Sequence, residues 1–483
     1  MTITGKAAES AESAAPSKAR PAAILAVLLT AQFMAMLDNS IVTVAAPSVR
    51  ADLHATGAGL QFIVAGYTLS YAVLLITGAR LGDRYGHSRI FRIGIGWFTL
   101  ASAVCGLAPD AGALMAARLV QGIGAALMMP QVMSLIQRIF SGAARAKALA
   151  LYGAVIACGA IAGQVAGGLL VSADLFGTGW RPIFLINVPI GVTLWLVGGR
   201  LLQRDAGDRG RSLDIAGVLG ISVTIALLVV PLVLGRELGW PVWTIVMLAL
   251  VAPALGGFWR IQATVGARGG QPLLPGTVLR SPGFGWATLV ILAMFAAFAG
   301  NMLTLALHLQ SGLGQSALTV GLEFLPGGVG FAIGGLTWRR LPAAWHRRIV
   351  PIGLAVTALG YLLLALILRD GATPGIAFLA VFLVIALGNG YAFSPALHLA
   401  LGPVPVRSAA DASGVLVTVF QVSQVLGVAV FGSVYFGLLT GSGATVSGLA
   451  IGTTTVLIAG ICLGGAVAAT LFIRATRRAD PSR

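Results

Sequence analysis

Residues 59–108 read GLQFIVAGYTLSYAVLLITGARLGDRYGHSRIFRIGIGWFTLASAVCGLA, two apolar runs joined by a short connector rich in arginine. The runs, 59–79 and 90–108, can each cross a hydrocarbon layer roughly 30 Å thick, because a helix rises about 1.5 Å per residue. The junction between them carries Arg80, Arg84, Arg89 and Arg92 around Asp83. This stretch therefore predicts two membrane-spanning helices that meet on a basic side of the membrane.

The same alternation runs through all 483 residues. Fourteen apolar runs occur near residues 22–46, 59–79, 90–108, 111–137, 148–172, 182–202, 215–234, 241–258, 284–310, 317–337, 349–368, 375–402, 411–438 and 446–473. With both termini in the cytoplasm, 26 of the 31 Lys and Arg residues lie inside, and Arg50, Arg181, Arg236 and Arg369 lie outside. Because basic residues favour the cytoplasmic side, we expect an all-α, multi-pass protein of the cell membrane with 14 helices and both termini cytoplasmic.

The composition excludes several classes of function. A net charge of +16 would indicate a nucleic-acid surface in a soluble protein, but here the charge follows the topology, so no nucleic-acid partner is expected. The three cysteines, Cys105, Cys158 and Cys462, fall inside apolar runs, and neither a metal site nor a cofactor is predicted. No lysine fits the phosphate-binding pattern GxxxxGK[ST], which leaves an ion gradient as the expected driving force.

Two longer basic connectors divide the chain. We expect a disordered cytoplasmic tail over 1–21, a six-helix bundle over 22–202, a linker with two helices over 203–283, a second six-helix bundle over 284–473 and a cytoplasmic tail over 474–483. Two related bundles around a central cavity are a common plan for transporters.

Four motifs and one supporting stretch carry a resemblance to a known family. They are LDNSIVTVAAP at 37–47, RLGDRYGHSR at 80–89, RLVQGIGAA at 118–126, GQVAGG at 163–168 and, in support, WRPIFLINVP at 180–189. In this order the chain resembles, essentially end to end, the fourteen-helix drug:proton antiporter branch of the major facilitator superfamily. The resemblance implies two six-helix bundles plus two extra central helices, and export driven by protons. Ala79, His87, Ser88 and Gln164 depart from the usual motif residues.

The resemblance also implies roles for individual residues. It makes Asp38 a proton site and links Arg118 to proton coupling. Asp83, Arg84 and Gly86 become parts of a cytoplasmic gate, in which we expect Asp83 to interact with the positive end of the following helix. A purely topological role for this basic loop is the alternative. Three further gating residues belong to the motif thought to bend or seal a helix pair: Gly163, Gly167 and Gly168.

Charges inside the membrane point to the same residues independently, since an ionisable group in hydrocarbon is costly. Counting along the helices puts Asp38 about 25 Å above the inner face and Arg118 about 10 Å below the outer face, so their depths agree. A desolvated carboxylate takes up a proton more readily, and a nearby arginine favours its release. The alternative is a static buried ion pair.

Glu323, about 10 Å deep by the same count, is the candidate for recognition of cationic substrates, unless it reaches headgroup water. Gln121, Gln164 and Gln421 are candidate substrate-binding residues, with helix-to-helix hydrogen bonding as the alternative. His308 and His398 are interpreted as interface residues.

These observations predict a monomeric secondary transporter that exchanges protons for lipophilic drugs or antibiotics, cationic ones among them, by alternating access. Its partners are a small-molecule substrate, protons and membrane lipid. Export of a specific metabolite, siderophore or lipid is the alternative within transport. A channel is disfavoured by the paired bundles, and a membrane enzyme by the lack of a catalytic constellation.

Overall fold

The computed structural model describes residues 19–479 except 203, 204, 206, 208–213, 236, 237, 269, 271, 273–277, 279, 280, 282, 343, 344, 347, 402–408 and 442. Every regular element in these ranges is a helix. The elements are α1 (Ala19–Asp52), α2 (Gly57–Tyr85), α3 (His87–Gly106), α4 (Ala111–Ile139), α5 (Gly142–Ala173), η1 (Leu175–Gly177), α6 (Pro182–Leu185), α7 (Asn187–Leu201), α8 (Ile215–Leu234), α9 (Val242–Ala267), α11 (Phe284–Leu307), η2 (His308–Gly312), α12 (Ala317–Glu323), α13 (Leu325–Thr337), η3 (Trp338–Arg340), α14 (Ile349–Leu368), α15 (Ile376–Leu401), α16 (Ala409–Leu438) and α17 (Ala444–Ala479).

Local sequence explains where several helices begin. Thr56, Asp110, Asp214 and Ser316 each accept a hydrogen bond from a backbone N–H in the first turn of the helix that follows. Such caps satisfy donors that the helix itself cannot pair, which matters most in a chain surrounded by lipid. These four helices therefore start where a small polar residue meets an apolar run.

Twelve helical segments of the described chain are long and apolar enough to cross a membrane. They include α6 with α7, α11 with η2, and α12 with α13 and η3, each taken as one segment. Two further helices of the bundle that contains α4, α3 and α5, are not among these twelve; within α5 the described side chains form a shorter apolar segment, Ile161–Ala173. The expected number of fourteen stays a prediction.

The two predicted cytoplasmic tails differ in how much of each the structure describes. The predicted tail 1–21 lies largely outside the described residues, and α1 is already helical at Ala19. The tail predicted over 474–483 is helical through Ala479, because α17 continues beyond its apolar part.

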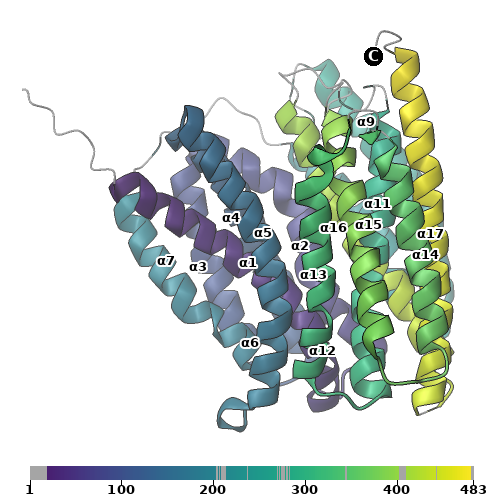
Figure 1. The fold of residues 1–483 in the computed structure, drawn as a ribbon. Helices are drawn as coiled ribbons and strands as arrows, with labels where there is room; N and C mark the ends of the chain where they lie inside the picture. The colour runs from purple at the N-terminus through teal and green to yellow at the C-terminus, as the bar shows by residue number, and fades with distance from the viewer. Residues whose placement is uncertain are drawn as a thin grey trace, which may run out of the picture.

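Helices α1 to α7 pack on one another, as do α11 to α17, and Figure 1 shows these two groups side by side, diverging toward the end that carries both termini. The apolar cores show the same asymmetry. One core, with Val44, Ile63, Leu303 and Phe431 among its members, joins both groups at the opposite end. Toward the termini each group has a separate core, around Phe98 in one group and Ile291 in the other. The two bundles are thus fused at one end and separate at the other.

The linker helices α8 and α9 form a hairpin beside the bundles. At its base the Asp214 carboxylate accepts hydrogen bonds from Gly217 N and from Gln262 Nε2, both at 2.8 Å. Helix α8 contacts α2 of the first bundle and α16 of the second, where Ser433 Oγ donates to Leu232 O at 2.9 Å. The hairpin therefore touches both bundles through α8.

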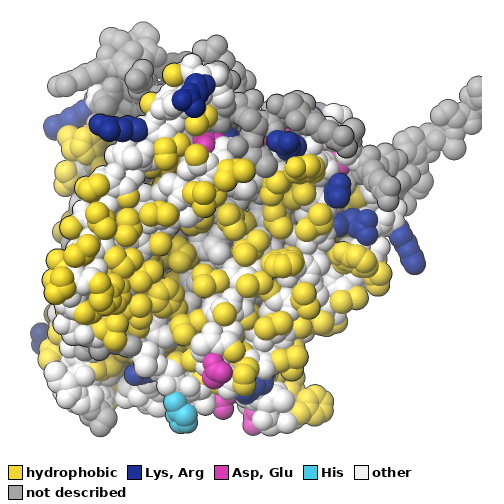
Figure 2. All heavy atoms as spheres, turned by 180° about the vertical axis from the view of Figure 1, so that it is seen from behind, with side chains coloured by type: hydrophobic (Ala, Val, Ile, Leu, Met, Phe, Trp, Pro, Cys, Tyr) yellow, Lys and Arg dark blue, Asp and Glu magenta, His cyan; other side chains and the backbone are white. Residues whose placement is uncertain are grey.

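The outer surface suits a bilayer. Figure 2 shows hydrophobic side chains covering the middle of one face, with most of its Lys and Arg side chains toward the end that carries the termini. Large apolar side chains of α9 such as Val242, Ile245 and Leu250 are exposed. Hydrophobic surface of this extent is stable where lipid covers it.

Candidate transport site

Asp38 and Arg118 meet in the interior of the first bundle, where both side chains are fully buried. Arg118 Nη1 lies 2.7 Å from Asp38 Oδ2, in a salt bridge between α1 and α4 whose partners are both 0% exposed. Gln121, one helical turn after Arg118, donates from Nε2 to Asp38 Oδ1 at 2.8 Å and accepts from Arg118 Nη1 at 2.6 Å. The structure thus brings together the two residues predicted for proton coupling. It assigns Gln121, predicted to bind substrate, to the same cluster.

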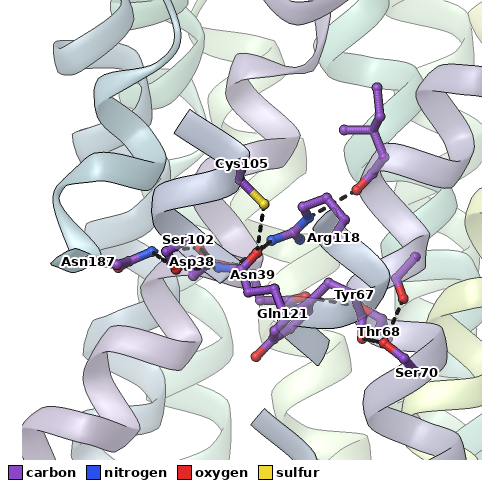
Figure 3. Close-up of polar contacts among 12 residues, drawn as sticks. Asp38, Asn39, Tyr67, Thr68, Ser70, Ser102, Cys105, Arg118, Gln121 and Asn187 are labelled. Carbon is purple, nitrogen blue, oxygen red and sulfur yellow. Dashed lines mark hydrogen bonds and ion pairs between the residues drawn. The ribbon is translucent and has the colours of Figure 1, made fainter. Parts of the chain in front are cut away.

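Two members of this cluster were not predicted. Asn187, at the start of α7, donates from Nδ2 to Asp38 Oδ1 at 2.7 Å, and Ser102 of α3 accepts a hydrogen bond from Gln121 at 2.8 Å. Figure 3 shows these side chains, from α3, α4 and α7, gathered around the Asp38 carboxylate of α1. The signal available for Asn187 was its position as an amide at the start of an apolar run, in the stretch that supported the family resemblance.

The guanidinium of Arg118 is held on its other sides as well. Its Nε donates to Ile63 O at 3.1 Å, and its central carbon lies 4.7 Å from the ring centroid of Tyr67 and 5.5 Å from that of Phe184. Its remaining terminal nitrogen, Nη2, has no hydrogen-bond partner. Buried charges of opposite sign that are also hydrogen-bonded compensate one another, so the cluster is neutral as a whole.

A cavity lies beside this cluster, between the two bundles. It measures about 40 Å³, enough for the centres of a few water molecules. Asn39, the residue after Asp38, lines the cavity and accepts a hydrogen bond from Thr68 Oγ1 at 3.1 Å. Gln164 lines it from α5 and Gln424 from α16. Asp38 itself is not among the lining residues, because successive residues of a helix point about 100° apart.

The predicted gate loop brings two carboxylates to the start of α3, those of Asp83 and of the linker residue Asp205. Asp83 Oδ1 lies 3.4 Å from His87 Nε2 and 3.9 Å from Arg138 Nη2, a residue of α4. The carboxylate at the N-terminus of α3 is that of Asp205, which accepts hydrogen bonds from His87 N at 2.7 Å and Ser88 N at 2.9 Å. Asp83 therefore reaches the start of this helix through the side chain of His87, and hydrogen bonds to the first backbone N–H groups come from a linker residue, Asp205.

Gly86 explains why Asp205 can come so close. Its φ of +95° is a conformation that other residues rarely adopt, and a Cβ there would lie 2.5 Å from Asp205 O. Arg84, the other predicted gate residue, lies over the ring of Tyr85, with 5.5 Å from its guanidinium carbon to the ring centroid. Burial alone would raise the pKa of Asp205, but the N–H groups of Ser88 and His87 outweigh it and hold that pKa below its usual value.

The amino-acid sequence matches a known family of membrane transporters. Residues 28–428 match the family described as the Major Facilitator Superfamily. The chain belongs to this superfamily. It is 41% identical over 442 residues to a probable actinorhodin transporter of Streptomyces coelicolor, covering 89% of this chain and 75% of the relative. It is 34% identical to the cephamycin export protein CmcT of Amycolatopsis lactamdurans, covering 93% and 90%.

Solved structures give the same fold. A bacterial homologue of the human lysosomal transporter Spinster, in an inward-facing and occupied conformation, superposes with a TM-score of 0.68 at 18% identity, over 95% of this chain and 98% of that one. The POT family transporter PepTSo gives a TM-score of 0.68 at 14% identity, over 96% of this chain and 99% of that one. The protein is thus a multi-pass membrane transporter with the major-facilitator fold.

The predicted sealing glycines of this superfamily member lie at tight helix contacts. A Cβ on Gly163 would be 2.6 Å from Leu37 O, and one on Gly167 would be 2.9 Å from Ile41 O, both on α1. On Gly168 it would be 2.5 Å from Ala317 O, which belongs to α12 of the second bundle. Gly163 and Gly167 therefore serve packing within one bundle, whereas Gly168 lies at the contact between bundles.

The remaining predicted residues lie away from the Asp38 cluster. Glu323 is half-buried and accepts from Gln315 Nε2 at 3.1 Å; it is not among the residues that line the cavity. Gln421 accepts from the cavity residue Gln424 at 2.9 Å. His308, interpreted from the sequence as an interface residue, is fully buried, and its Nδ1 lies 2.8 Å from Ser447 Oγ. Its position at an apolar run's end gave no sign of this burial.

Proposed function

We propose that the protein exports lipophilic drugs or antibiotics from a bacterial cell in exchange for protons, by alternating access. The export of antibiotics is supported by relatives named as an actinorhodin transporter, a cephamycin export protein and a methylenomycin A resistance protein. The proposal extends the membrane topology to 14 spanning helices with cytoplasmic termini, α3 and α5 included.

A single observation carries the proton part of the proposal: the buried Asp38 carboxylate is adjacent in sequence to Asn39, which lines the cavity between the bundles. A proton on Asp38 would cancel its attraction to Arg118 and weaken the contact of α1 with α4. Any rotation of α1 that follows would move Asn39, and with it the cavity wall. Proton binding and cavity shape are then linked, and linkage acts in both directions.

In the proposed alternating access, the bundles open at their fused end and close at the end where they are separate. At the fused end, Gln310 Nε2 donates to Val44 O at 2.7 Å, and Leu318 N donates to Ser172 Oγ at 3.1 Å, joining the second bundle to α1 and α5. Breaking these contacts while the separate cores at the other end approach would turn the cavity from one side of the membrane to the other.

The test is proton-driven uptake of an exported antibiotic into inverted vesicles. We expect Asp38→Asn to abolish uptake driven by a pH gradient while the protein remains folded in the membrane. Asp110→Asn is the matched control, because Asp110 caps α4 at its exposed start and asparagine caps equally well. Normal gradient-driven uptake by the Asp38→Asn variant would remove Asp38 from the mechanism.

A further inference from the structure

The cavity between the bundles has two chemically different walls. The wall contributed by the first bundle is rich in neutral hydrogen-bonding groups. Five of its seven lining side chains are hydroxyls or amides: Asn39, Ser40 and Thr43 of α1, Thr68 of α2 and Gln164 of α5.

The facing wall, contributed by α11 and α16 of the second bundle, is mainly apolar. Its apolar lining residues are Phe298, Ala299, Met302, Val425 and Val428, and Gln424 is its one polar member among the described residues. Aromatic and thioether groups give large contact areas to flat hydrophobic ligands. The two walls together suit a molecule with one polar edge and one apolar face.

The described lining residues include no Asp, Glu, Lys, Arg or His. The carboxylate next in sequence, Asp38, is turned into the first bundle and compensated by Arg118. A charged ligand would lose its hydration here without meeting an opposite charge, and that loss is costly. Glu323, expected from the sequence to recognise cations, lies outside this lining.

Gln164 marks where the polar edge of the ligand would bind. Its Oε1 is buried and has no hydrogen-bond partner within the protein, and its Nε2 makes a weak contact with Met302 Sδ at 3.7 Å. A buried carbonyl oxygen without a partner favours a ligand that donates a hydrogen bond. The cavity of about 40 Å³ is far below the roughly 300 Å³ or more of a drug site, so the bundles must separate to admit the ligand.

We propose that this cavity selects uncharged, amphipathic molecules whose polar edge carries a hydroxyl or N–H donor for Gln164 Oε1 and whose apolar face packs on α11 and α16. The inference rests on the transport function proposed above and names the substrate class of its site. An ionisable substrate would enter as its neutral form.

The test uses three probes that share one aromatic body: a neutral phenol, its methyl ether and a quaternary ammonium derivative. Each is offered to reconstituted vesicles under a pH gradient. We expect the intact protein to carry the phenol, to carry the methyl ether about five- to ten-fold less efficiently because one hydrogen bond is lost, and to leave the quaternary probe at background. Gln164→Leu should abolish the difference between phenol and ether.

Gln164→Glu places a carboxylate in the cavity and should raise transport of the quaternary probe above background. Gln137→Glu makes the same chemical change at an exposed position of α4 and should not. If the intact protein carries the quaternary probe as well as the phenol, the proposed substrate class is wrong, whereas the proposed transport function is not contradicted. If an intact protein that is correctly inserted moves none of the three, the transport function fails and this inference with it.

Discussion

The energetic coupling of Asp38 and Arg118 can be measured with a double-mutant cycle. The perturbations are Asp38→Asn, which keeps the shape of the side chain, and Arg118→Met, which keeps its length without the charge. Either change alone leaves one charge buried without its partner. Both together leave no buried charge in the cluster.

The expected magnitudes follow from the contacts. Removing one member of a buried ion pair costs about 3–5 kcal/mol of unfolding free energy, so independent effects would add to roughly 6–10 kcal/mol. After Arg118→Met the carboxylate keeps the hydrogen bonds from Gln121 and Asn187, which places that variant toward the lower end. We expect the double variant to lose about 3 kcal/mol less than the sum of the single variants.

The assay is reversible unfolding in mixed micelles with a denaturing detergent, followed by tryptophan fluorescence and analysed for all four proteins at one pH. The fluorescence reports on the fold, because Trp180 is buried near the bundle that contains the pair. Effects of the two changes that simply add would refute the reasoning, since the pair would then contribute no coupling energy.

Two further predictions concern helix contacts and the linker. Gly168→Ala pushes a methyl group against Ala317 O of the second bundle and should increase the labelling, from the fused end, of a cysteine placed at Thr43. Gly163→Ala, whose methyl group meets a helix of its own bundle, should lower thermal stability without increasing that labelling. Equal labelling in the two variants would contradict the prediction. Asp205→Ala should cost about 1 kcal/mol at pH 7, as loss of a helix cap does. Because the folded pKa of Asp205 is lowered, the cost should be fully present above about pH 4, the ordinary pKa of an aspartate, and should disappear as the pH falls through the lowered folded pKa; a cost that stays constant as a denaturation series is extended into acid would argue against the cap.

The sequence predicts the helices and the location of the central charge pair, because hydropathy and distance along a helix depend only on residue order. Asp38 and Arg118 were placed at matching depths by counting, and the structure joins them at 2.7 Å. The spacing of Arg118 and Gln121 places both on one face of α4, so the membership of Gln121 in the cluster was within reach of the same reasoning.

Other features depend on the rotation of each helix about its axis and on the path of the connectors. Neither property leaves a periodic pattern in a single sequence. The orientation that turns Asp38 inward and Asn39 toward the cavity is set by packing between helices. The cap on α3 comes from Asp205, more than 100 residues later in the chain, so local spacing pointed to Asp83 instead.

Helix α8 contacts α2 in one bundle and α16 in the other, through Leu232 and Ser433 among others. If the two bundles rock against each other as proposed, both contacts cannot be preserved, and α8 would slide along one partner in each transport cycle. The cost of this sliding would be absent from a twelve-helix transporter without the hairpin. The turnover rate should therefore change with the size of the side chains on the face of α8 that contacts the bundles, even though α8 contacts neither the substrate nor the proton site.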